Sequence, residues 1–184
     1  MPLGLLQSPA LKWANRTLRG GTIMLTAAER QQKIDTIRRF PAELEALVSH
    51  LSEADLYTPY LDGEWTVAQN VHHVADSHMN SVIRLKLALT EDQPTIKAYH
   101  QDDWAELPDA KNAPIESSLL LIKGLHARWC ILWDSLDEAA WARTWHHPEA
   151  GKILTVEDLL NTYDNHCKAH IDQIQRTLAA KKPQ

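Results

Sequence analysis

Three helix-start motifs constrain the fold of this 184-residue chain more than any other feature. They are Thr26-Ala-Ala-Glu29, Thr66-Val-Ala-Gln69 and Thr155-Val-Glu-Asp158, and in each a threonine stands three residues before an acidic or amide side chain. In such a capping box the two side chains bond reciprocally to backbone N–H groups that a helix start leaves free. The motifs therefore predict three long helices that begin at these positions.

Apolar residues recur every three to four positions after each motif, which is the pattern of amphipathic helices. A fourth segment, from about Pro114 to Leu136, has the same pattern. Pro41 predicts a kink or a restart in the first helix, because its ring removes one N–H group and crowds the preceding turn. We expect short helical turns near 52–55 and 137–141 and loops over 91–112 and 146–151, and no segment is clearly a strand. The expected fold class is all-α, a four-helix bundle.

The first 25 residues differ from the rest, because they contain three basic residues, no acidic residue and several prolines and glycines. We predict a flexible N-terminal tail over residues 1–25, followed by a single bundle domain over residues 26–180. A basic start without acids is also similar to a transit peptide, whereas the apolar segment and cleavage site of a signal peptide are not evident.

Charge and cysteine content exclude some classes of partner. The formal net charge is −5 and the pI is near 6.0, which disfavours a nucleic-acid surface because phosphate binding needs concentrated basic residues. No apolar run approaches the ~18 residues of a membrane span. The two cysteines form neither a CxxC motif nor a disulfide framework, which is typical of a reducing compartment. We therefore expect a cytoplasmic protein without nucleic-acid or membrane partners.

The predicted last helix contains His166 and His170, which are four residues apart. This spacing places both imidazoles on one face, about 5–6 Å apart at Cβ, where they could bind one metal ion. Such pairs also occur without a metal, and no glutamate follows His166 as in the HExxH motif of metalloproteases. A third ligand from another helix would complete a site with an open coordination position.

An internal similarity between the two halves of the chain helps to find that ligand. Leu51-Ser-Glu-Ala-Asp-Leu56 followed by Trp65-Thr-Val67 resembles Leu136-Asp-Glu-Ala-Ala-Trp141 followed by Leu154-Thr-Val156. We therefore expect two pseudo-symmetric helical hairpins that face each other.

The position of each histidine relative to its capping threonine supports a third ligand on the second helix. At ~100° per residue, His73 lies about −20° from its threonine, and His166 and His170 lie about +20° and +60° from theirs. The three side chains thus occupy similar faces of equivalent helices. This favours His73 over His72 and over His78, which is better placed for the core.

The segment Gly63-Glu-Trp-Thr-Val-Ala-Gln-Asn-Val-His-His-Val-Ala-Asp-Ser-His-Met-Asn80 resembles the signature of the DinB/YfiT-like superfamily, and of its YfiT branch in particular. Five further stretches resemble the same family: Lys86-Leu-Ala-Leu-Thr-Glu91, Pro94-Thr-Ile-Lys97, Trp104-Ala-Glu-Leu-Pro-Asp109, Leu125-His-Ala-Arg-Trp129 and His147-Pro-Glu149. The likeness extends over roughly residues 28–178.

The resemblance implies a four-helix bundle, often a homodimer, that binds one divalent metal ion through a histidine on the second helix and an HxxxH pair on the last. The family position is the histidine eight residues after the tryptophan of the Trp-Thr-Val motif, which is His73 when counted from Trp65. His166 and His170 are then the pair. Members of the family are described as binding nickel or zinc, and as metal-dependent hydrolases or as S-transferases that use a low-molecular-weight thiol such as bacillithiol.

These ligands fit three functions. A metal-bound thiol would be deprotonated and transferred to a small electrophilic substrate, and we favour this bacillithiol-transferase-like reaction because the metal supplies the activation. A metal-bound water molecule with a pKa near ~7 would instead make the protein a hydrolase. A metal-binding stress protein without turnover is the third alternative.

The sequence identifies no catalytic base, so the catalytic residues other than the metal ligands stay unknown. Asp76 and Asp164 are close to the histidines in sequence and could act as a base or orient an imidazole. Three polar residues could hold the carboxylate of a cosubstrate: Asn80, Arg84 and Arg128. Cys167 and three tryptophans are expected in the core: Trp65, Trp129 and Trp133.

Overall fold

Long helices begin at all three capping boxes in the computed structural model, which describes residues 24–181. They are α1 (Ala27–Val48), α3 (Val67–Thr90) and α8 (Val156–Ala179), and in each the capping threonine and the residue three positions later bond reciprocally. The fourth long helix is α6 (Glu116–Asp134). The predicted all-α four-helix bundle is confirmed.

A kink or a restart was predicted at Pro41, and the first helix continues through that residue without a restart. A proline at this position cannot donate to the carbonyl of Ile37, four residues earlier. That carbonyl instead accepts a hydrogen bond from Nδ1 of His126 on α6, at 2.7 Å. The helix tolerates the proline because a neighbouring helix satisfies the freed acceptor.

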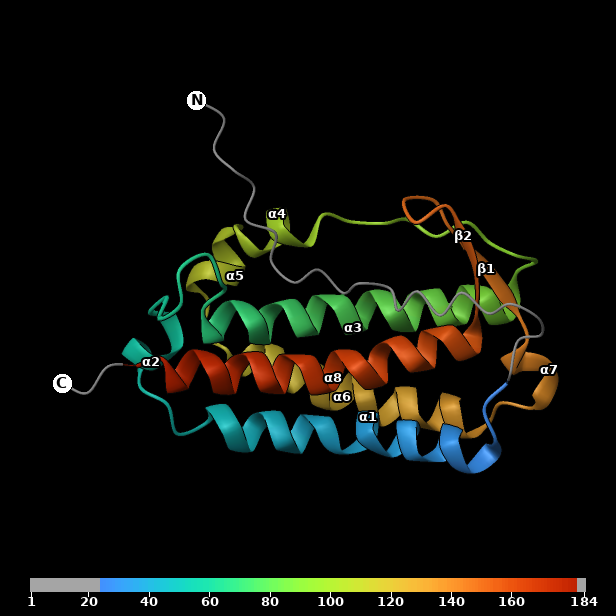
Figure 1. The fold of residues 1–184 in the computed structure, drawn as a ribbon, viewed down its shortest axis with the longest axis horizontal. Helices are drawn as coiled ribbons and strands as arrows, with labels where there is room; N and C mark the ends of the chain where they lie inside the picture. Colours follow the sequence, from blue (N-terminus) through green and yellow to red (C-terminus); the bar gives the residue numbers. More distant parts are fainter. Residues whose placement is uncertain (1–23, 182–184) are drawn as a thin grey trace.

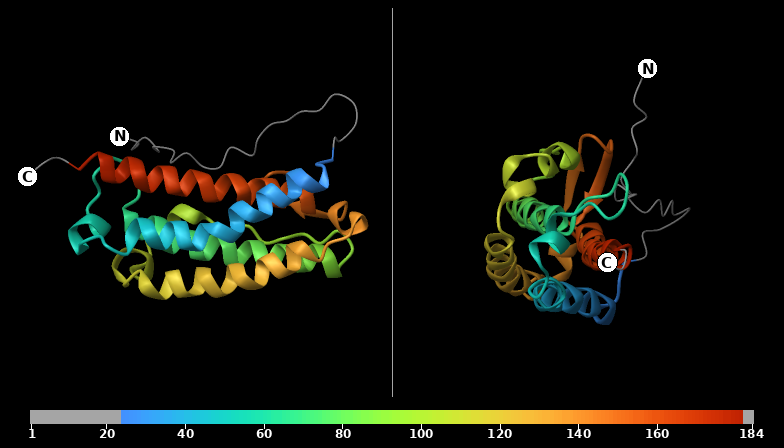
Figure 2. Two further views of the ribbon diagram at one scale, coloured as in Figure 1. Left: turned by 90° about the horizontal axis from the view of Figure 1, so that it is seen from below. Right: turned by 90° about the vertical axis from the view of Figure 1, so that its left-hand side faces the viewer.

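The four long helices interleave the two halves of the chain. α1 and α8 run in one direction, and α3 and α6 run in the other (Figure 1). Seen along the bundle, α1 and α3 occupy opposite corners, so each of them packs against both α6 and α8 (Figure 2). The expected pair of facing hairpins is therefore corrected: helices that follow each other within one half are diagonal, and α3 lies beside α8.

The interior of the bundle is apolar and strongly aromatic. Its fully buried side chains come from all four long helices and include Ile37, Phe40, Leu44, Leu85, Ile122, Trp129, Trp133, Leu159, Leu160 and Ile174. Trp129 and Trp133 are thus core residues, as predicted. None of the helices within residues 24–181 combines the length and the apolar character that crossing a bilayer requires.

Four short helices connect the long ones: α2 (Glu53–Tyr57), α4 (Gln101–Ala105), α5 (Pro108–Asn112) and α7 (Glu138–Trp141). α2 and α7 coincide with the predicted helical turns. α4 and α5 lie where a loop was predicted, and neither has a side-chain cap at its first turn. The sequence therefore carries no start signal for them.

β1 (Thr144–His147) and β2 (Lys152–Thr155) form a small antiparallel hairpin, although no segment of the sequence is clearly a strand. Neither strand alternates apolar and polar residues along its four positions, so the usual sequence signal of a strand is missing. The turn between them contains Gly151 with a φ of 60°, a conformation that favours glycine. His146 also bonds to the backbone of residues 94–96. The hairpin thereby connects the segment after α3 to the start of α8.

Two residues of the predicted tail belong to the bundle. Met24 packs against the core, and the backbone N–H of Leu25 donates to Oε2 of Glu157 at 3.0 Å. The rest of the predicted tail, residues 1–23, lies outside the described residues.

Candidate metal centre

The structure brings together the three histidines that the sequence singles out. His73 comes from α3, and His166 and His170 come from the facing side of α8; all three are buried. One ring nitrogen of each lies within 4.8 Å of the other two, and the Nε2 atoms of His73 and His166 are 3.3 Å apart. Two nitrogens on one tetrahedral ion, with bonds of 2.0–2.1 Å, would be about 3.3–3.4 Å apart. The arrangement fits a single ion, and binding of that ion stays a prediction.

Burial keeps the three imidazoles neutral. Loss of hydration lowers the pKa of His73 and of His166 well below the ordinary value, and the proximity of His170 lowers both further. Burial also lowers the pKa of His170 to about 4. Neutral imidazoles have a free lone pair at pH 7, and a divalent cation needs ligands in this state.

Asn70 orients His170. The Asn70 side-chain nitrogen donates to the carbonyl of Thr66 at 3.0 Å, so its oxygen faces the ring of His170. His170 Nδ1 lies 2.9 Å from that oxygen, which can only accept. The proton of His170 is therefore on Nδ1, and the Nε2 lone pair is directed to the cluster.

A row of histidines orients His166 in the same way. Its Nδ1 lies 3.0 Å from Nε2 of His78, and His78 Nδ1 lies 2.7 Å from Nε2 of His126. His126 Nδ1 donates to the Ile37 carbonyl, the acceptor that Pro41 leaves free. Because a carbonyl only accepts, each ring in the row donates through Nδ1 and accepts through Nε2. The Nε2 atom of His166 is therefore left unprotonated.

Trp65 covers the cluster from the side of the α2–α3 loop. Its ring is half-buried, with its centroid 4.6 Å from that of His73 and 6.5 Å from that of His170, and it is nearly parallel to the latter ring. The prediction of a core position for Trp65 is thus corrected, because this tryptophan packs on the candidate centre instead. It shields the imidazoles from solvent on that side.

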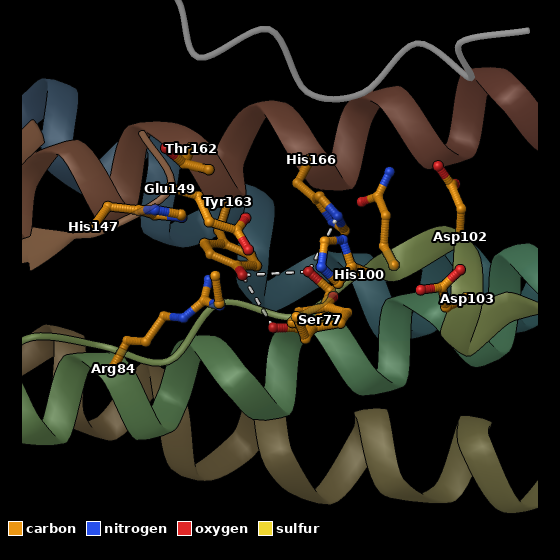
Figure 3. Close-up of a pocket in the computed structure, with 13 residues that line it drawn as sticks. Ser77, Arg84, His100, Asp102, Asp103, His147, Glu149, Thr162, Tyr163 and His166 are labelled. Carbon is orange, nitrogen blue, oxygen red and sulfur yellow. Dashed lines mark hydrogen bonds between the residues drawn. The ribbon is translucent and has the colours of Figure 1, made fainter. Parts of the chain in front are cut away.

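A cavity of about 480 Å³ opens beside His166. It lies between α3 and α8, and the segment 98–103 and the β1–β2 hairpin cover it (Figure 3). The Oγ atom of Ser77 lies 3.3 Å from both the Tyr163 hydroxyl and Nε2 of His166. A molecule in the cavity would therefore meet a candidate metal ligand and two hydroxyl groups.

Two other histidines of α3 are not in the cluster, as predicted. His72 bonds to the Ser118 hydroxyl and to the Ala113 carbonyl, on the side of α3 that faces α6. His78 is fully buried in the core. Its contact with His166, however, gives it a role that the sequence did not predict.

The two acidic candidates do not bond to the cluster. Asp164 is buried on another face of α8, where it pairs with Lys33 at 3.0 Å and with Lys168 at 2.6 Å. Burial alone would raise the pKa of Asp164, but hydrogen bonds from Lys168 and Lys33 lower it below the ordinary value. Asp76 is half-buried, and burial together with the charge of Asp109 raises its pKa to about 6. Within residues 24–181, the partners of the three imidazoles are other histidines, Ser77 and Asn70, and none is a carboxylate.

The three residues considered for binding a carboxylate lie in different environments. Arg84 lines the cavity, Asn80 bonds to the carbonyl of Asp76, and Arg128 is exposed on α6. Cys167 is buried, and burial raises the pKa of its thiol well above the ordinary value, so it is a neutral core residue as expected.

The sequence did not predict the hydrogen bonds by which three further residues support the centre: Asn70, His78 and His126. Asn70 stands three residues before His73, so it belongs to the same helical face, and that spacing was an available signal. The row from His126 to His166 depends on contacts between three helices, and nothing in the sequence shows it.

Comparison with known proteins agrees with this architecture. Residues 36–174 match the DinB superfamily. The protein YfiT of Bacillus subtilis (strain 168) is 40% identical over 157 residues, which are 84% of this chain and 88% of that protein. A relative from Bacillus mycoides (strain KBAB4) is 46% identical over 147 residues, which are 79% of this chain and 84% of the relative. Both carry the name "putative metal-dependent hydrolase".

Two solved structures share the fold. That of Bacillus subtilis YfiT, described as "a probable metal-dependent hydrolase with an unusual four-helix bundle topology", superposes with a TM-score of 0.82 at 39% identity and covers 86% of this chain and 90% of its own. A mutant of mycothiol-dependent maleylpyruvate isomerase superposes with a TM-score of 0.64 at 16% identity, covering 82% of this chain and 63% of its own. At that identity the likeness concerns the fold alone.

Proposed function

Because this chain belongs to the DinB superfamily, as the match over residues 36–174 establishes, we propose that it is a metal-dependent enzyme in which His73, His166 and His170 bind one divalent ion, zinc or nickel. The observation that carries this proposal is a buried cluster of three neutral imidazoles with two opposed Nε2 atoms 3.3 Å apart. Nitrogen-only donor sets of this kind suit zinc and nickel better than the hard ions calcium and magnesium, which prefer oxygen.

The favoured reaction is the transfer of a low-molecular-weight thiol to a small electrophile. A bound divalent ion supplies Lewis-acid activation, which lowers the pKa of a coordinated thiol or water molecule. In the transfer, sulfur forms a bond to the electrophilic carbon, the leaving group departs with its bonding electrons, and the thiol proton passes to solvent. Thiol transfer needs no carboxylate base at the centre, and the imidazoles have no carboxylate partner among the described residues.

The residues around the cluster have definable tasks in this reaction. Asn70 directs the Nε2 lone pair of His170 toward the cluster, and His78 does the same for His166. The Ser77 hydroxyl can donate to a substrate atom next to His166, because it lies within 3.3 Å of that ring and faces the cavity. Trp65 packs on the rings of His73 and His170 and shields them from water. The small molecule would enter from the cavity.

Hydrolysis is the second candidate, and the names of the Bacillus relatives favour it. The same ligands and cavity would serve it, with water in the place of the thiol.

Homodimerisation also stays a prediction, which analytical ultracentrifugation of the purified protein tests.

Metal analysis tests the ligands. The purified protein should contain about one zinc or nickel ion per chain, His166→Ala should lose it, and the matched control His72→Ala should keep it. Stoichiometric metal in His166→Ala would contradict the assignment.

A substrate panel tests the reaction. The metal-loaded protein is assayed with thiol–electrophile pairs, esters and amides, each against His166→Ala. We expect metal-dependent thiol conjugation. Ester or amide cleavage without conjugation would favour the hydrolase, and no turnover at all would favour a metal-binding protein without catalysis.

A further inference from the structure

Arg84 is a buried cation that has no acidic partner within residues 24–181. The residue is 8% exposed, and its guanidinium forms no ion pair with the acidic residues of that segment. Arg30, the second arginine that is buried within residues 24–181, is paired with Glu157 at 2.8 Å and with Glu138 at 2.7 Å. A buried charge loses hydration, and proteins normally compensate that loss with a counter-ion. For Arg84, the described part of the chain supplies none.

The guanidinium of Arg84 also has unused donors. Among the described residues, its buried Nε atom has no hydrogen-bond partner, and Nη2 makes one long bond, of 3.4 Å, to the carbonyl of Lys97. The ring of Tyr99 lies beneath it, with 5.9 Å between the guanidinium carbon and the ring centroid. Nε and one Nη are the pair of donors that bind both oxygens of a carboxylate.

This guanidinium faces the same cavity as His166. Figure 3 shows Arg84 reaching from α3 toward Tyr163, on the opposite side of His166 and Ser77 from Asp102 and Asp103. A small molecule in the cavity can therefore contact Arg84 at one end while its other end lies beside the candidate metal ligand.

We propose that Arg84 binds the carboxylate of a small organic monoanion in this cavity, and that this carboxylate belongs to the thiol-bearing cosubstrate. The assignment to the cosubstrate rests on the proposed function, whereas the carboxylate subsite rests on the position of Arg84 in the cavity and on its lack of an acidic partner within residues 24–181. The charges around the cavity select the class of anion. Asp102, Asp103 and Glu149 are exposed on its rim and repel anions, which opposes a phosphate ester of charge near −2 more strongly than a carboxylate of charge −1.

A matched pair of thiols tests the subsite in the metal-loaded enzyme. Protein loaded with Co²⁺ is titrated with 3-mercaptopropionate and with the neutral 3-mercaptopropionamide, and the sulfur-to-cobalt absorption band reports binding. The wild type should bind the carboxylate roughly tenfold to a hundredfold more tightly, as expected for a charge-assisted bidentate bond. Arg84→Gln should reduce this ratio to about one, and Arg84→Lys should keep part of it because the charge remains without the planar pair of donors. Arg128→Gln, an exposed arginine of α6, is the control and should keep the wild-type ratio.

A second arm separates this inference from the proposed function. Metal-free protein is titrated with benzoate and benzamide, and binding is followed by NMR chemical shifts. A preference for benzoate that disappears in Arg84→Gln supports the carboxylate subsite. If at the same time neither thiol changes the cobalt band, thiol activation is refuted and the subsite is not. The subsite is refuted where wild type shows no preference for the carboxylate in either arm, or where Arg84→Gln retains the wild-type preference. Inorganic phosphate that displaces benzoate as effectively as acetate does would overturn the carboxylate class.

Discussion

Asn70 and His170, 100 residues apart in the sequence, are joined by a hydrogen bond of 2.9 Å that determines which nitrogen of His170 is free. The amide of Asn70 is itself held by the Thr66 carbonyl at the first turn of α3. The start of one helix thus sets the tautomer of a candidate ligand on another. Loss of such a supporting bond typically lowers metal affinity by about 10- to 100-fold.

Asn70→Leu should therefore weaken zinc or nickel binding by about 10- to 100-fold, because the side chain keeps a similar volume but loses the acceptor. Competition with a coloured chelator measures the affinity. Asn80, on the same helix, bonds to the Asp76 carbonyl and to no ligand histidine within residues 24–181, so Asn80→Leu is the matched control and should bind metal as the wild type does. Equal affinities for the two variants would show that Asn70 does not support a ligand.

The row of histidines makes a second prediction. His78→Phe breaks the bond to His166 Nδ1, so the proton of His166 can occupy either nitrogen, and we expect metal affinity to fall by about tenfold or more. His72→Phe replaces a neighbouring histidine that bonds outside the cluster, so it should change thermal stability without changing metal affinity. Isothermal titration with zinc measures both. Tight binding by His78→Phe would mean that His166 is oriented by other groups.

Asp164 should matter for stability and not for the metal. Asp164→Asn removes the charge that Lys33 and Lys168 neutralise. Both lysines can turn to solvent, so we expect a loss of about 1–2 kcal/mol in the free energy of unfolding, less than for a fully enclosed pair. Urea unfolding measures it, and Asp172→Asn, an exposed aspartate paired with Arg176, should change it by less than about 0.5 kcal/mol. If Asp164→Asn lost metal binding, Asp164 would orient a ligand imidazole after all, contrary to its contacts in the structure.

The buried histidines predict acid sensitivity of the metal-free protein. Burial lowers the pKa of His126 and of His170 to about 4, whereas an unfolded histidine titrates near ~6.5. Between these values the unfolded chain binds more protons than the folded one, so the free energy of unfolding falls as the pH drops from 6.5 to 4. Each histidine contributes at most about 3 kcal/mol to this fall. Urea titrations across this range should show it, and His126→Phe should make the slope shallower. A flat profile would mean that the histidines titrate normally.

Local signals in the sequence were sufficient for the long helices. Each capping box lies within four residues, so the chain specifies those helix starts without tertiary contacts. α4 and α5 carry no side-chain cap, and the two strands show no alternation of apolar and polar residues. Their formation therefore depends on packing of α4 and α5 against α3 and on the pairing of β1 with β2. Those segments could not be assigned from their own residues.

The candidate site likewise contains residues that local sequence signals predict and residues that only tertiary contacts bring together. His166 and His170 are a local pair, and the similarity between the halves was enough to add His73. The diagonal placement of α1 and α3 was not predictable, because the similarity relates the halves without saying how they pack. For the same reason the row of hydrogen bonds from Ile37 through His126 and His78 to His166 was not foreseen.

The two nitrogens that face each other across the candidate centre belong to residues 93 positions apart. An ion held by both would therefore cross-link the chain and close a long loop. In the chain-entropy description, a covalent cross-link around a loop of about 100 residues disfavours the unfolded ensemble by roughly 4–5 kcal/mol, and a metal clip that stays attached works in the same direction. The ion would connect α3, in the first half of the chain, to α8, its last helix. Thermodynamic stability of the fold alone would then be a reason to retain the three histidines, even in a relative whose cavity had come to hold a different substrate.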